Sequence, residues 1–92
     1  MQKFRKKIAE TLGVPPSAVM NIPVVTLQGN ISAAIENYKS VMLYTDSEIR
    51  INCGATVVSL YGTGLCIDNI GGDFVSVSGD FQKIEYETVK KR

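Results

Sequence analysis

Downstream of Pro23, apolar and polar residues alternate with a period of two. The alternating runs are short and bounded by turn-forming residues, which is typical of half-buried β-strands. The pattern predicts seven or eight strands, at residues 24–29, 31–36, 41–46, 48–53, 58–61, 65–68, 75–78 and 83–87.

Short breaks rich in glycine, asparagine and aspartate separate these runs. Glycine accepts positive φ, and asparagine and aspartate bond their own backbone, so the breaks predict turns. They leave no room for the crossover helices of a parallel sheet, which indicates an antiparallel meander. To bury one face, such a sheet must curl, fold into a small sandwich or wind into a β-roll. The glycines expected at chain reversals are Gly29, Gly62, Gly64 and Gly79.

One five-residue phrase occurs three times, at residues 25–29, 58–62 and 75–79. It reads apolar, Ser or Thr, apolar, variable, Gly, and its apolar positions are expected to face a core. Gly62-Thr63-Gly64 also matches the start of a dinucleotide-binding fingerprint, but Ile67 occupies the place of the third glycine. A strand rather than a helix is expected to follow, and a phosphate cradle needs a helix N-terminus. The phrase therefore predicts strand ends that run into glycine turns.

The N-terminal residues follow a different period. Phe4, Ile8 and Leu12 recur at intervals of four, which predicts an amphipathic helix over residues 2–12 that ends at Gly13. So short a helix is marginal alone in water, so it must dock on this protein, on a partner or on a membrane. The chain is accordingly divided into a helical segment (1–22), a β domain (23–88) and a basic tail (89–92).

The net charge of +1 conceals an uneven distribution. Residues 1–13 carry four bases against one acid, residues 14–82 two bases against six acids, and residues 83–92 four bases against two acids. The net charges are therefore +3, −4 and +2, so both ends are basic and the middle is acidic. Basic ends suit an acidic partner or an anionic membrane surface, and they also fit solvated termini that aid solubility.

The composition argues against an enzyme. A chain of 92 residues forms one domain with a modest core and little room for a deep cleft. It contains no histidine, so the commonest general base and metal ligand is missing, and we expect no cofactor. Cys53 and Cys66 are too few for a disulfide scaffold and are expected to be small buried residues. No apolar stretch follows the basic start, which predicts a cytoplasmic protein without a signal peptide.

Arg50 is one of two bases in the acidic middle of the chain and lies on the polar face of its expected strand. A cross-strand ion pair is the simplest role for it, and a surface contact with a partner is the alternative. Nucleic-acid binding is not expected, because the aromatic residues are scattered and the acidic middle repels phosphate.

Four stretches, "IPVVTLQGN", "IENYKSVMLYT", "IRINCGA" and "GTGLCIDNI", together resemble the YabP/YqfC family of sporulation proteins of endospore-forming bacteria. The chain departs from the family pattern at Tyr38, where the family often has histidine, and in the glycine-rich stretch after Ile67. The matching pieces are Thr26-Leu27, Gly29-Asn30, Ile35-Glu36-Asn37, Tyr44-Thr45, Ile49-Arg50-Ile51-Asn52, Gly62, Gly64-Leu65, Gly79 and Ile84-Glu85.

The resemblance implies a role in endospore formation in the mother cell, at the periphery of the forespore membrane, without a known enzymatic activity. It implies a protein partner, such as a membrane protein of the sporulation apparatus, or self-association. The bases that would meet an acidic partner or anionic lipid are Lys3, Arg5, Lys6 and Lys7. The alternative is a β module that binds a small ligand or carbohydrate of the spore cortex or envelope, with Tyr44 and Tyr61 gathered on one face.

Overall fold

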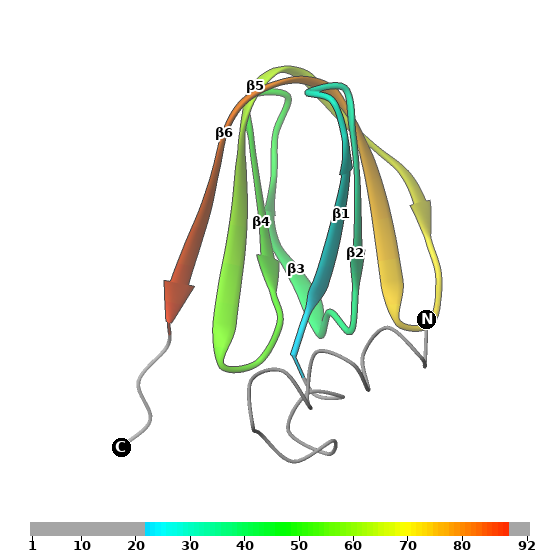
Figure 1. Cartoon of the computed structure of the whole chain (residues 1–92), viewed down its shortest axis with the longest axis vertical. Coiled ribbons are helices and arrows are strands. Elements are labelled where there is room, and N and C mark those ends of the chain that lie inside the picture. Colours follow the sequence, from blue (N-terminus) through cyan, green and yellow to red (C-terminus); the bar gives the residue numbers. More distant parts are fainter. Residues whose placement is uncertain (1–21, 89–92) are drawn as a thin grey trace.

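The computed structural model describes residues 22–88, which form one six-stranded antiparallel sheet (Figure 1). The expected N-terminal helix and the basic tail lie outside the described residues. The order across the sheet is β1-β2-β6-β5-β4-β3. The strands are β1 (Val24–Gln28), β2 (Ser32–Glu36), β3 (Ser40–Tyr44), β4 (Glu48–Asn52), β5 (Thr56–Ile70) and β6 (Phe74–Thr88).

The sheet folds over on itself because β5 and β6 bend halfway along their 15 residues. Both strands arch across the top of the molecule in Figure 1. The first half of β5 and the second half of β6 join β4 and β3 in one layer, which we call leaf A. The other halves of β5 and β6 join β2 and β1 in leaf B. The expected curled sheet is therefore a single sheet folded into two leaves.

Glycines allow the bends. A Cβ on Gly62 would overlap the carbonyl oxygen of Asp80 on the neighbouring strand, so only glycine fits this crossing. Gly64 and Gly79 have positive φ, at 63° and 147°, beside irregularities in the β5–β6 register. The reversals expected at these three glycines are wrong, since all three lie inside strands. Gly29 does lie in a turn, between β1 and β2.

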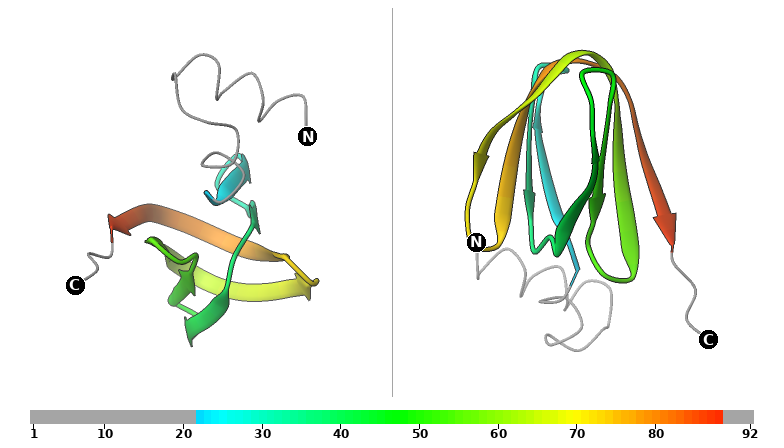
Figure 2. Two further views of the ribbon diagram at one scale, coloured as in Figure 1. Left: turned by 90° about the horizontal axis from the view of Figure 1, so that it is seen from below. Right: turned by 180° about the vertical axis from the view of Figure 1, so that it is seen from behind.

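The strand count follows from the same bends. The runs expected as separate strands at 58–61 and 65–68 are two halves of β5, and those at 75–78 and 83–87 are two halves of β6. The expected simple meander is also wrong, because β2 lies beside β6 rather than β3. The link from β2 to β3 instead crosses beneath the two long strands (Figure 2, left). Its Tyr38 packs against the core, and the Tyr38 hydroxyl donates to the Gly71 carbonyl at 3.3 Å.

The core lies between the leaves and consists of the inward-facing residues of the alternating pattern, as predicted. Val58, Leu60, Val75 and Val77, four of the six apolar positions of the repeated phrase, are fully buried. Val25 is partly buried against the core, but Leu27 is 46% exposed. The buried cluster comprises Ala33, Ile35, Ile49, Ile51, Cys53, Val58, Leu60, Leu65, Val75, Val77 and Phe81.

The two leaves repeat one arrangement. β4 pairs with the five residues of β5 that precede Gly62, and β2 pairs with the five residues of β6 that precede Gly79. The turn before β4 accepts hydrogen bonds from Gly62 and Leu65, and the turn before β2 accepts them from Gly79 and Phe81, at 2.8–3.1 Å. The 17-residue spacing of two of the phrases thus reports two equivalent strand halves, each entering a bend.

Candidate functional site

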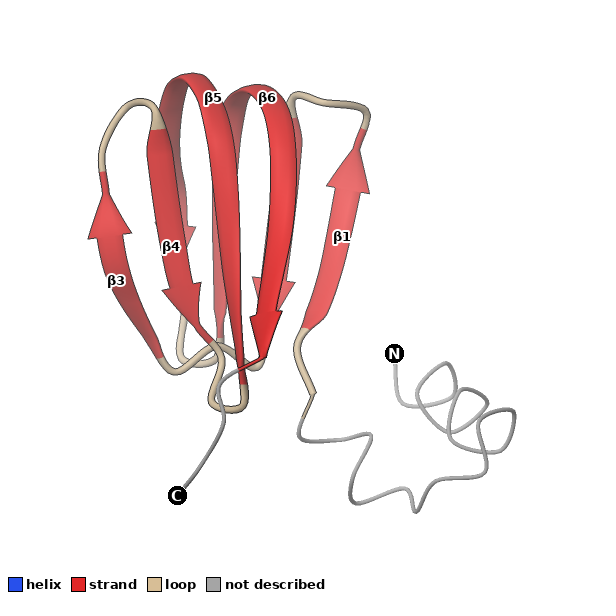
Figure 3. Cartoon of the chain, turned by 90° about the vertical axis from the view of Figure 1, so that its left-hand side faces the viewer, coloured by secondary structure: helices blue, strands red, loops and turns tan. Residues whose placement is uncertain are grey.

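Folding the sheet leaves two seams, where an edge strand of one leaf faces the edge of the other. We call the seam between β3 and the second half of β5 the closed seam, and the seam between β1 and the second half of β6 the open seam. β1 and β3, the two edge strands, lie at opposite sides of the curved sheet in Figure 3.

Tyr44 joins the two leaves across the closed seam. It pairs with Ile49 on the inner side of leaf A, and its hydroxyl oxygen accepts a hydrogen bond from the Ile67 backbone N–H at 3.0 Å. Ile67 belongs to the second half of β5, in leaf B. A single side chain thus satisfies an edge amide that has no strand partner on that side among residues 22–88.

Leu27 occupies the position in the open seam that Tyr44 occupies in the closed one. The register shows this, because Leu27 pairs with Ala33 as Tyr44 pairs with Ile49. By the same register, Ile84 is the equivalent of Ile67. Leucine has neither the length nor the hydroxyl to repeat the tyrosine's bond, so the open seam lacks that bond.

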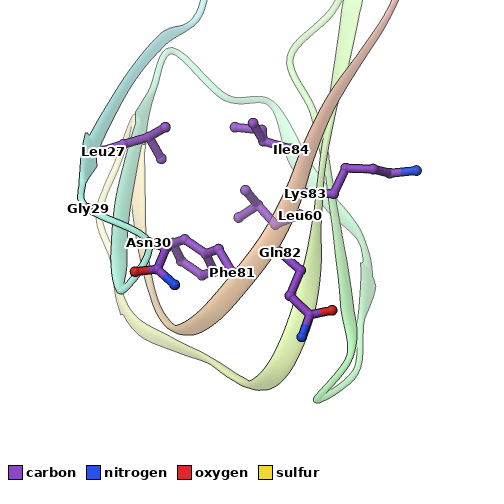
Figure 4. Close-up of a pocket in the computed structure, with 8 residues that line it drawn as sticks. All are labelled: Leu27, Gly29, Asn30, Leu60, Phe81, Gln82, Lys83 and Ile84. Atoms are coloured by element: carbon purple, nitrogen blue, oxygen red, sulfur yellow. The ribbon is translucent and has the colours of Figure 1, made fainter.

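A pocket of about 170 Å³ lies at this point of the open seam. The side chains of Leu27 and Ile84 approach it from opposite sides (Figure 4). The pocket is mainly apolar. The side chains of Gln82 and Lys83 point away from it in Figure 4, and the Lys83 ammonium lies over the Tyr61 ring on the outer face of leaf A. The lining residues of the pocket are Leu27, Gly29, Asn30, Leu60, Phe81, Gln82, Lys83 and Ile84.

The borders of the open seam are strand edges. Within the described residues, β1 has β2 as its only neighbour, and β6 has no neighbour beyond Lys83 on the side away from β5. Alternate N–H and C=O groups of such an edge point outward and can pair with an added strand. Tyr86, paired with buried Val58, adds apolar surface that is 57% exposed. The open seam therefore combines unpaired backbone with a side-chain pocket.

The polar residues of leaf A form a ladder on its outer face, away from the seam. Arg50 Nε lies 3.0 Å from Glu48 Oε2, the Tyr61 hydroxyl donates to Glu85 at 3.2 Å, and Lys83 Nζ lies 4.7 Å from the Tyr61 ring centre. Hydrogen bonds to Tyr61 and Glu48 raise the pKa of the Arg50 guanidinium. The cross-strand pair expected for Arg50 is wrong, because its acidic partner lies two residues along the same strand.

The two tyrosines of the alternative carbohydrate site do not share a face. Tyr44 lies on the inner side of its leaf, paired with Ile49, whereas Tyr61 lies on the outer face among Glu48 and Lys83. Lys3, Arg5, Lys6 and Lys7 lie outside the described residues. Within residues 22–88, no group of three or more acidic or sulfur side chains is arranged to hold a metal ion, and no helix is long and apolar enough to cross a membrane.

The two cysteines differ. Cys53 is buried in the core, as expected, whereas Cys66 is exposed on β5, and both are free thiols. Burial raises the pKa of the Cys53 thiol, and the positive charge of Lys39 opposes this shift.

The described residues carry a strong negative charge. Residues 22–88 contain three bases against eight acids, a net charge of −5. Two of the acids, Glu85 and Glu87, alternate with Ile84 and Tyr86 along the half of β6 that borders the open seam. The alternating pattern did not predict this site, because it assigns Leu27 to the core. Only the order of the strands shows that Leu27 lies on an edge strand.

Comparison with known proteins gives two matches. A sequence profile described as the YabP family matches residues 22–92. The chain is 23% identical to "Uncharacterized protein YqfC" of Bacillus subtilis (strain 168) over 84 residues, which cover 91% of this chain and 90% of that protein. No solved structure matches significantly.

Proposed function

The chain belongs to the YabP family, and we propose that it acts in endospore formation as a non-enzymatic module that binds another protein in the mother cell. Support for the sporulation role comes from the family and from the similarity to YqfC. The chain's lack of histidine supports a binding role over catalysis. In this proposal the module works at the cytoplasmic periphery of the forespore membrane, where it meets a protein of the sporulation apparatus.

The single observation that carries the binding role is the open seam. Its two edges offer backbone groups for strand addition, a common mode of peptide recognition in which main-chain bonds give affinity and pockets give specificity. The pocket between Leu27 and Ile84 supplies a place for one apolar side chain of the partner. The proposed mechanism is therefore the addition of an extended partner segment along β6, with one side chain anchored between the leaves.

The test compares partner capture by three tagged proteins in sporulating cells. Leu27→Tyr introduces the residue of the closed seam and fills the pocket. Met42→Tyr is the matched control, because Met42 is 55% exposed on β3, at the opposite edge of the sheet. We expect quantitative mass spectrometry to find one protein recovered by the parent and by Met42→Tyr but reduced about tenfold or more with Leu27→Tyr. Equal recovery by all three proteins would contradict a role for the open seam.

The alternative, a module that binds a small ligand or carbohydrate of the cortex, has weaker support. Carbohydrate recognition of the expected kind needs aromatic rings on one face, and Tyr44 and Tyr61 lie on opposite faces. The pocket is also smaller than the roughly 300–1,000 Å³ typical of small-molecule sites.

A further inference from the structure

We infer that the pocket of the open seam receives the chain's own N-terminal segment, residues 1–12, with the ring of Phe4 seated between Leu27 and Ile84. The inference rests on the proposed function in one respect, since it takes the same seam as the binding surface. It adds a ligand that is part of the protein and that competes with an external strand.

The pocket has the size and lining for one aromatic ring. Its volume is about 170 Å³, and a cavity of about 150 Å³ lined by leucine, isoleucine and phenylalanine binds benzene. Its apolar lining is of the same kind and consists of Leu27, Ile84 and the buried Leu60 and Phe81. Phe4 is the only aromatic residue in residues 1–21.

The chain is long enough to bring Phe4 to the pocket. The described part begins at Ile22, whose carbonyl accepts from Asn37 Nδ2 at 2.9 Å, and β1 then runs along the open seam. β1 covers about 17 Å with its five residues. The nine residues 13–21 span up to about 30 Å when extended, so residues 1–12 can fold back along β1 and reach the pocket.

Charge favours the same arrangement. Residues 1–12 carry Lys3, Arg5, Lys6 and Lys7 against one acid, a net charge of +3, and residues 22–88 carry −5. Glu85 and Glu87 follow the pocket residue Ile84 along β6, on the outer face of leaf A. The four bases flank Phe4 in the sequence, so an anchored ring would hold them at the edge of a sheet whose described residues carry a net charge of −5. Such an attraction weakens with salt, whereas seating of the ring does not.

Cysteine pairs test the docking directly. Lys3→Cys with Gln82→Cys, in a Cys66→Ser background, keeps Phe4 and Leu27 in place and should form a disulfide within the monomer under mild oxidation. Lys3→Cys with Met42→Cys is the matched control, since Met42 lies on β3, the edge strand opposite β1. We expect the first pair to close about tenfold faster or more, because docking raises the effective concentration of its thiols. Equal rates would overturn the inference, and so would a disulfide found only between two molecules.

A double-mutant cycle gives an independent readout in the full chain without new thiols. Phe4→Ala should lower the midpoint of thermal unfolding in the parent but not in Leu27→Tyr, where tyrosine already fills the pocket. An equal effect of Phe4→Ala in both backgrounds would show that the ring lies elsewhere.

Partner capture separates this inference from the proposed function. If Leu27→Tyr loses the partner while the cysteine pair fails to close, the seam binds a partner but not residues 1–12. If the pair closes while capture is unchanged, the seam holds residues 1–12 and the proposed function is wrong.

Discussion

The bend at Gly62 gives the sharpest prediction for stability. In Gly62→Ala, the new methyl group would overlap the carbonyl oxygen of Asp80 and lie 2.9 Å from its carbon and 3.0 Å from the Phe81 Cα. All three atoms are backbone of the paired strand β6, so no side-chain rotation relieves the overlap. Overpacking of this kind costs about 1–3 kcal/mol, and contact with fixed backbone places this variant near ~3 kcal/mol.

Gly64→Ala is the matched control for this variant, two residues along the same strand. A Cβ at Gly64 meets no atom within 4 Å, so the substitution costs only the strain of its left-handed φ of 63°, about 1 kcal/mol. Urea unfolding followed by circular dichroism measures both variants, and a slope near ~1.5 kcal/mol/M converts ~3 kcal/mol into a midpoint lower by about 2 M. If Gly62→Ala were as stable as Gly64→Ala, the tight crossing of β5 and β6 would not exist as described.

Three further predictions concern the closed seam and the thiols. Tyr44→Phe removes the acceptor for the Ile67 N–H and should lower the free energy of unfolding by about 0.5–1.5 kcal/mol, measured by urea unfolding; an unchanged value would refute the bond's contribution. In the native protein, a thiol reagent should modify exposed Cys66 promptly and Cys53 only as the fold opens; equal rates would contradict the burial of Cys53. Because the pKa of the Cys53 thiol is raised by folding, its contribution to the free energy of unfolding should be complete below the unfolded-state pKa of about 8.5 and should decline as pH rises through the folded-state pKa. Cys53→Ala should flatten this decline in unfolding curves recorded between about pH 7 and 10.

Much of the fold could be predicted from the sequence. The period-two alternation located every strand and the inward position of Val58, Leu60, Val75 and Val77, because burial of one face imposes that period on a half-buried strand. The antiparallel pairing followed from the short breaks, which exclude crossover helices.

The bends and the strand order could not be predicted in this way. A glycine at the end of an alternating run suits a turn and a bend equally, and the distinction depends on distant contacts, such as the Gly79 N–H donating to the Ile31 carbonyl. The pairing of β2 with β6 likewise joins residues 38 to 46 positions apart, for example Ala33 and Val77. A sequence signal did exist in the two phrases 17 residues apart, which mark equivalent halves of β5 and β6.

The candidate site was hidden for a related reason. In the alternating pattern, Leu27 falls on the side of the strand that is expected to face the core. Its side chain is nevertheless 46% exposed, because β1 is an edge strand. Its equivalence to Tyr44 is visible only once both pairing registers are known. The strand expected after Gly64 is confirmed, because β5 continues through Gly64 and Ile67.

Hydrogen exchange in the complex with the captured partner tests the central claim most directly. If the open seam is the binding surface, the outward-pointing backbone amides among residues 83–88, on the free edge of β6, should exchange about tenfold slower or more when the partner is added, because an added strand would bond them. The amides of β3, at the opposite edge, should exchange at the same rate with and without it. Protection that appears at β3 while residues 83–88 are unchanged would contradict the assignment of the open seam as the binding site.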